Sequence, residues 1–93
     1  MSETPNFHDN IERQRFELIE NDLTAFADYS RQVNRLTIPH VESPPQLRGK
    51  GTAARLMSAI ADYAVRNDLR IVPLCGYARA WFRRHPERAD ILA

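Results

Sequence analysis

The sequence predicts an α/β (α+β) fold, in which a mixed, twisted sheet contains a strand-helix-strand core and a C-terminal helix follows it. Three observations support this class: apolar and polar residues alternate along the first half, helical spacing begins near residue 53, and an apolar run follows at 69–75. The 93 residues, 43% hydrophobic and 27% charged, suit one small domain. We expect a flexible N-terminal tail at 1–10, which is polar and aperiodic, and a single domain at 11–93.

Alternating runs at 16–19 and 23–29 predict two antiparallel strands of a hairpin. The polar segment 20–22 between them, Glu-Asn-Asp, is typical of a hairpin turn. A second turn at 32–34 leads to a third strand at 36–41. The first half of the domain is therefore expected to supply the antiparallel part of the sheet.

The strongest helical pattern covers 53–64, where apolar residues repeat at the spacing of one buried helix face. Asn and Asp at 67–68 tolerate the left-handed conformation that ends a helix. The apolar run 69–75 then predicts a buried strand, parallel to the strand before the helix. A last helix is expected from 78 to about 84, since it must end before Pro86.

The two halves of the chain carry opposite net charge. Residues 1–45 contain four arginines and eight acidic residues, whereas residues 46–93 contain nine basic and four acidic residues. This asymmetry indicates an anionic ligand for the second half. We do not expect that ligand to be nucleic acid, because no aromatic residues are interleaved with the basic ones for base stacking.

Cys75 is the only cysteine, which excludes an internal disulfide and a multi-cysteine zinc site, so no metal is expected. The longest uncharged stretch of the second half, 71–78, is far too short to cross a membrane. Residues 1–10 lack the basic start and apolar stretch of a secretory signal. We therefore expect a cytoplasmic protein, monomeric and without a membrane partner.

The segment 46–53 is a glycine-bearing turn that leads directly into the predicted helix. A helix N-terminus exposes unpaired N–H groups and a partial positive charge, so it can bind an anion. Gly49 and Gly51 would let the backbone approach a phosphate, and Arg48 and Lys50 add positive charge. The alternative is an ordinary tight turn with solvated cations.

This turn carries a resemblance to a known family. Residues 48–53, Arg-Gly-Lys-Gly-Thr-Ala, resemble the Arg/Gln-x-x-Gly-x-Gly/Ala signature of the GNAT N-acetyltransferase superfamily. The wider run PPQLRGKGTAARLMSAIADYAVRNDLRIVPLC, followed by RRHPE, is similar to the short, single-module GNAT-related proteins of about this length. The resemblance covers roughly 16–92. It implies a minimal GNAT fold and transfer of an acetyl group from acetyl-CoA to an amine acceptor, either a small molecule or a protein lysine.

The resemblance also implies which residues contact acetyl-CoA or CoA. Backbone N–H groups of the turn would hold the pyrophosphate, and the candidates are Gln46, Leu47, Arg48, Gly49, Lys50, Gly51, Thr52 and Ala53. On the last helix, Arg83, Arg84 and His85 are candidates to contact the adenosine or its 3′-phosphate. The alternatives are a solvated basic face and a histidine that caps the helix.

In folds of this family two parallel strands part to form a cleft for the pantetheine arm. Pro39 and Pro73 give an independent reason for such a parting, because each lies in a strand that flanks the helix and lacks the N–H of a ladder hydrogen bond. Strands that both contain proline cannot pair along their whole length. Alternatively, each proline lies on an unpaired side of its strand.

Acetyl transfer to an amine needs a base for the amine and a proton for the leaving thiolate. His40 and Glu42 are the candidate bases, and their spacing puts them on one face of an extended strand. Glu42 falls where some GNAT enzymes carry a carboxylate, and His40 matches a position usually occupied by histidine in the short family. The alternative for Glu42 is an ordinary solvated carboxylate.

Cys75 ends the opposite strand, in a Pro-Leu-Cys motif shared with the short family. As a catalytic residue it would accept the acetyl group, with His40 as its base. Its alternative is a small buried apolar residue, the commonest fate of a lone cysteine.

Phe82 departs from the superfamily pattern, since it stands where a tyrosine often protonates the CoA thiolate. Phenylalanine cannot donate that proton, and the reach of the nearby Tyr77 is not readable from sequence. The predicted function is therefore an acetyl-CoA-dependent N-acetyltransferase, with a CoA-binding module of little or no catalysis as the alternative.

Overall fold

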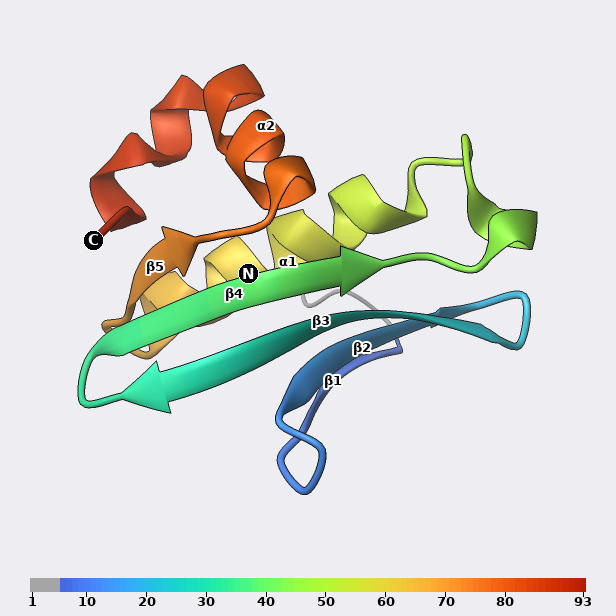
Figure 1. Cartoon of the computed structure of the whole chain (residues 1–93), viewed down its shortest axis with the longest axis horizontal. Coiled ribbons are helices and arrows are strands. Elements are labelled where there is room, and N and C mark those ends of the chain that lie inside the picture. The colour runs from blue at the N-terminus through green and yellow to red at the C-terminus, as the bar shows by residue number, and fades with distance from the viewer. Residues whose placement is uncertain (1–5) are drawn as a thin grey trace.

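Within residues 6–93, which the computed structural model describes, a five-stranded mixed sheet has the order β1-β2-β3-β4-β5 (Figure 1). The first four strands pair antiparallel, and β4 and β5 pair parallel. The predicted α+β class is confirmed. The elements are β1 Phe7–Asn10, β2 Arg15–Glu20, β3 Leu23–Gln32, β4 Arg35–Glu42, α1 Thr52–Arg66, β5 Arg70–Pro73 and α2 Gly76–Arg84, with 3₁₀ turns at Pro45–Leu47 and Pro86–Ile91.

The strand β1 corrects the prediction of a flexible tail over residues 1–10. Phe7–Asn10 pairs with β2, and the Phe7 ring stacks on Phe16 at 5.7 Å between centroids. Four residues are too few for a period to be read, and the stabilising partner lies further along the chain. The tail prediction was wrong for these four residues, and residues 1–5 lie outside the described part.

The predicted hairpin between β2 and β3 is confirmed, with its turn at Asn21 and Asp22. Both residues have positive φ, 52° and 61°. Such a two-residue turn matches the right-handed twist of the paired strands. The polar trio in the sequence therefore marks the hairpin because Asn and Asp tolerate this backbone region.

The core forms where α1 covers one face of the sheet, behind β4 in the view of Figure 1. Four of the five apolar residues predicted for the buried helix face are fully buried, and Ala53, at the start of the helix, is partly buried. Burial of one such leucine or isoleucine side chain stabilises the fold by about 1.5–3 kcal/mol. The buried residues opposite the helix are Phe16, Leu18, Ala25, Ala27, Leu36 and Ile38.

The strands β4 and β5 part after Ile38 and Pro73, the last pair of their parallel ladder. β5 is therefore shorter than the predicted 69–75, because the chain beyond Pro73 turns into α2. On the other side of β4, the register with β3 shifts so that Ile38 and Pro39 both lie opposite Tyr29. Both prolines thus stand where pairing changes, as their lack of an N–H predicts.

The outer edge of β5 is occupied by the end of the chain. Leu92 forms an isolated parallel bridge with Ile71, and the Ala93 N–H donates to the Ile71 carbonyl at 2.9 Å. At the other end of the sheet β1 has only four residues. No helix within residues 6–93 is long and apolar enough to span a bilayer.

Candidate functional site

The predicted turn leads into α1 through two glycines in the left-handed region, Gly49 with φ +77° and Gly51 with φ +80°. Gly51 is the N-cap of α1, and no side chain caps this end of the helix. The first intrahelical hydrogen bond runs from the Arg55 N–H to the Gly51 carbonyl. The N–H groups of the first turn are therefore available to an anion, as the helix geometry requires.

A carboxylate from the sheet fixes this turn. Glu20, the last residue of β2, accepts a hydrogen bond from the Thr52 hydroxyl at 2.6 Å and two from Arg55 at 2.7 and 2.8 Å. Arg55 also donates to the Lys50 carbonyl at 2.9 Å. The hydrogen bonds from Arg55, and next from Thr52, lower the pKa of Glu20 to about 2. The clamp formed by Glu20, Thr52 and Arg55 engages the Thr52 hydroxyl and not its backbone N–H.

A cavity of about 660 Å³ lies between this turn, the end of β4 and the start of α2. It brings together eight residues that the sequence predicted: His40, Glu42, Leu47, Arg48, Gly49, Gly51, Thr52 and Ala53. Sequence reasoning missed four lining residues: Val41, Ser43, Ala54 and Tyr77. The hydroxyl oxygen of Ser43 is buried and has no hydrogen-bond partner among the described residues.

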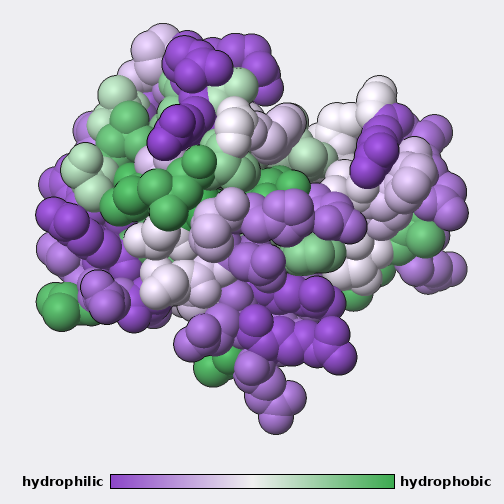
Figure 2. Space-filling view, viewed as in Figure 1, coloured by the Kyte–Doolittle hydropathy of each residue, from purple (hydrophilic) through white to green (hydrophobic). Residues whose placement is uncertain are grey.

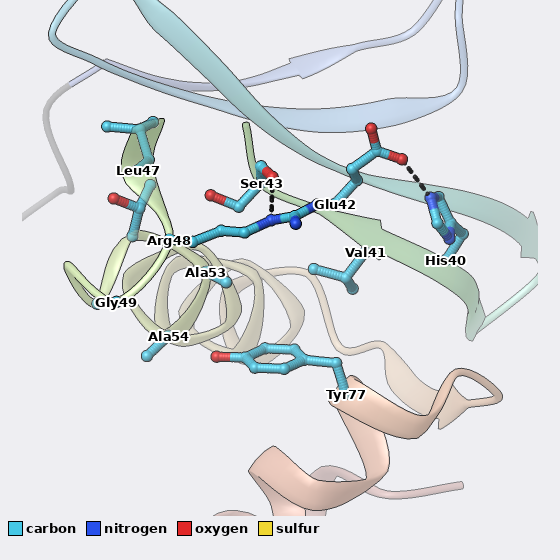
Figure 3. Close-up of a pocket in the computed structure, with 12 residues that line it drawn as sticks. His40, Val41, Glu42, Ser43, Leu47, Arg48, Gly49, Ala53, Ala54 and Tyr77 are labelled. Carbon is cyan, nitrogen blue, oxygen red and sulfur yellow. Dashed lines mark hydrogen bonds and ion pairs between the residues drawn. The ribbon is translucent and has the colours of Figure 1, made fainter. Parts of the chain in front are cut away.

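His40 and Glu42 form a pair at the cavity rim, with His40 Nε2 2.9 Å from Glu42 Oε1 (Figure 3). The shifted register of β4 explains their position, since it turns Val41 toward the core and the His40–Glu42 pair toward the open face. Both side chains of the pair are about half exposed. The predicted common face is confirmed.

Tyr77 forms the opposite wall of the cavity, from the first turn of α2. Figure 3 shows Val41 pointing from β4 toward the Tyr77 ring, and the Tyr77 hydroxyl pointing toward Ala53 and Ala54. Burial raises the pKa of Tyr77, while the positive charge of Arg84 acts in the opposite direction. The only sequence signal for this residue was its nearness to Phe82, which stands where a tyrosine is common in the superfamily.

The sequence model of one protein family, described as GCN5-related N-acetyl-transferase, matches residues 15–91. The chain belongs to the GCN5-related N-acetyltransferase family. A similar solved structure is the solution structure of a GCN5-like protein from Staphylococcus aureus, described as a candidate N-acetyltransferase. It superposes with a TM-score of 0.72 at 22% identity, over 97% of this chain and 91% of that one, and so shares the GNAT fold. No curated protein sequence matches the chain.

Three of the predicted site residues of this GCN5-related chain do not line the cavity, although each is close in sequence to a residue that does. Gln46 and Lys50 are exposed on the turn. Cys75 is the N-cap of α2, where its sulfur accepts the Ala78 N–H at 3.3 Å. The cysteine thus stabilises the helix that carries Tyr77.

The candidates at the end of α2 also separate in space. Arg83 lines a smaller hollow of about 270 Å³ with Arg79 and three apolar residues, near the hydrophobic patch that Figure 2 shows over β5 and the segment leading to α2. Arg84 is exposed, and its charge acts on Tyr77. The His85 ring stacks on Trp81 at 4.1 Å, and its Nδ1 donates to the Trp81 carbonyl at 2.8 Å. These are contacts of a residue that ends a helix.

No three His, Cys, Asp or Glu side chains in the described part of this family member gather in a way that could hold a metal ion.

Proposed function

We propose that this protein transfers the acetyl group of acetyl-CoA to an amine. The observation that carries the proposal is the uncapped N-terminus of α1, which opens into the same cavity as the His40–Glu42 pair. Acetyl-CoA supplies an activated acetyl thioester and a diphosphate. At one end, the cavity offers an anion site for the diphosphate. At the other end, it offers a proton acceptor for the amine that attacks the thioester.

The chain's own groups fit a diphosphate at the turn. The N–H groups at the start of α1 point toward an anion, and the helix adds a partial positive charge. Arg48 lines the cavity, and Lys50 is exposed beside it. A Cβ at Gly51 would come within 3.0 Å of the Arg55 guanidinium, so glycine keeps the turn close to the clamp. The cavity volume also lies within the range of about 300–1,000 Å³ that is common for ligand sites.

His40 is the proposed base, oriented by Glu42. When Nε2–H donates to the Glu42 carboxylate, Nδ1 is left as the acceptor that can take a proton from the attacking amine. Glu42 then acts as a positioning residue. The amine that reaches His40 must be uncharged when it attacks, and the half-exposed pair gives the released proton a route to solvent.

The test is to measure CoA binding by calorimetry and CoA release from acetyl-CoA with a panel of small amines and lysine peptides. We expect micromolar binding and amine-dependent release. His40→Gln should lower kcat by about 10²–10⁴-fold and leave CoA affinity unchanged. Binding without release with any amine would instead identify a CoA-binding module. Absence of CoA binding would overturn both functions.

A further inference from the structure

Tyr77 is a cavity residue with a role still unassigned. The hydroxyls of Tyr29 and Tyr63 both donate to Asp9. The Tyr77 hydroxyl, by contrast, has no hydrogen-bond partner within residues 6–93, although the side chain is partly buried in the cavity wall. Its orientation toward Ala53 and Ala54 directs it at the first turn of α1 (Figure 3).

We propose that Tyr77 is a further CoA-binding residue, whose hydroxyl donates a hydrogen bond to a diphosphate oxygen held at the N-terminus of α1. This inference rests on the proposed function. The backbone N–H groups approach the anion from α1, and the phenol approaches it from α2 on the opposite wall. The N-terminus of α1 alone would contact the diphosphate from one side. A second donor on the opposite wall would fix its position.

The protonation state of Tyr77 suits this role. Burial raises the pKa of its phenol, and Arg84, seven residues further along α2, only partly offsets that effect. The hydroxyl therefore remains a neutral donor at neutral pH. A phenolate would instead repel the diphosphate.

The orientation of Tyr77 also separates it from the role of a proton donor to the thiolate. In Figure 3 the hydroxyl points toward the first turn of α1, whereas His40 lies at the other end of the cavity. Phe82 cannot supply the proton either, since its ring carries no acidic group, and it is buried against Trp81. Loss of the Tyr77 hydroxyl should therefore weaken CoA binding and leave the chemical step intact.

The test is Tyr77→Phe, which removes the hydroxyl and keeps the ring. We expect the Kd of CoA, measured by calorimetry, to rise about tenfold, the effect of one hydrogen bond to a charged group. The Kd of pantetheine, which lacks the diphosphate, should be unchanged, as should kcat at saturating acetyl-CoA. Tyr63→Phe is the matched control, because it removes a tyrosine hydroxyl outside the cavity.

Three results would overturn the assignment: an unchanged CoA affinity in Tyr77→Phe, an equal loss for pantetheine, or a lower kcat at unchanged affinity. The last would make Tyr77 the acid of the reaction. These results are distinct from failure of the proposed function. That failure appears in the wild-type protein, as absence of CoA binding or of turnover, before any variant is compared.

Discussion

Gly51 combines two demands that other residues meet poorly. Its φ of +80° lies in the left-handed region, and a Cβ there would approach Arg55 Nη1 to 3.0 Å. Gly51→Ala should therefore lower the free energy of unfolding by about 1–2 kcal/mol. It should also weaken CoA binding, because the shifted guanidinium disturbs the turn.

The matched control for Gly51 is Gly76→Ala at the start of α2, where an added Cβ meets nothing within 4 Å. Chemical denaturation and CoA titration of both variants make the comparison. Equal behaviour of the two alanine variants would contradict the role given to the Gly51 backbone.

Cys75 has a structural task that predicts the outcome of its substitution. Because its sulfur caps α2, Cys75→Ser should keep both the cap and the activity. Cys75→Ala should lose up to about 1 kcal/mol of stability with the cap. Intact and peptide mass spectrometry after rapid quench with acetyl-CoA should show no acetyl group on Cys75. An adduct that forms as fast as turnover would instead establish covalent catalysis through this residue.

Between elements, the clamp of Glu20, Thr52 and Arg55 ties the end of β2 to the start of α1. The Glu20 carboxyl has a pKa lowered from 4.5 to about 2, so its contribution to stability is complete above pH 4.5 and is lost as the pH falls toward 2. That contribution is on the order of 2 kcal/mol for a partly exposed pair.

Glu20→Gln should lower stability at pH 7 and flatten its decline between pH 4.5 and 2, as measured by urea unfolding at several pH values. Glu12→Gln, an exposed carboxyl in the β1–β2 loop, should leave the pH profile unchanged. A wild-type pH profile in Glu20→Gln would mean that the clamp does not couple the two elements.

Periodicity and turn chemistry predicted most elements because their information is local. The β2–β3 hairpin and α1 both depend on residues that are neighbours in the sequence. β1 escaped prediction because four residues show no period and are stabilised by contacts with β2. The end of β5 depends on where its partner strand leaves it, which no local pattern records.

In the candidate site too, local features could be predicted from the sequence, and features that depend on packing could not. The turn at 46–53 and the His40–Glu42 spacing could be predicted because each lies within one stretch of chain. Tyr77 could not, since its place opposite Val41 arises from the packing of α2 against the sheet. Cys75 was expected at the cleft from its position in a strand, yet the strand ends before it and the residue caps a helix.

For the whole molecule, the opposite charges of the two halves partly neutralise each other on folding. Glu20 from the acidic half pairs with Arg55 from the basic half. Arg88 pairs with Asp62 within the basic half. Near the cavity, Arg48 lines the wall and Lys50 is exposed on the same turn, where an anionic ligand would meet them.

The two ends of the sheet bear on how this molecule behaves at high concentration. An exposed sheet edge is a template for strand addition by another copy, the first step of many aggregation reactions. Here Leu92 and Ala93 occupy part of the β5 edge, and the β1 edge is only four residues long. Deletion of those last two residues would uncover the backbone carbonyl of Ile71, so we expect the shortened protein to aggregate more readily at high concentration.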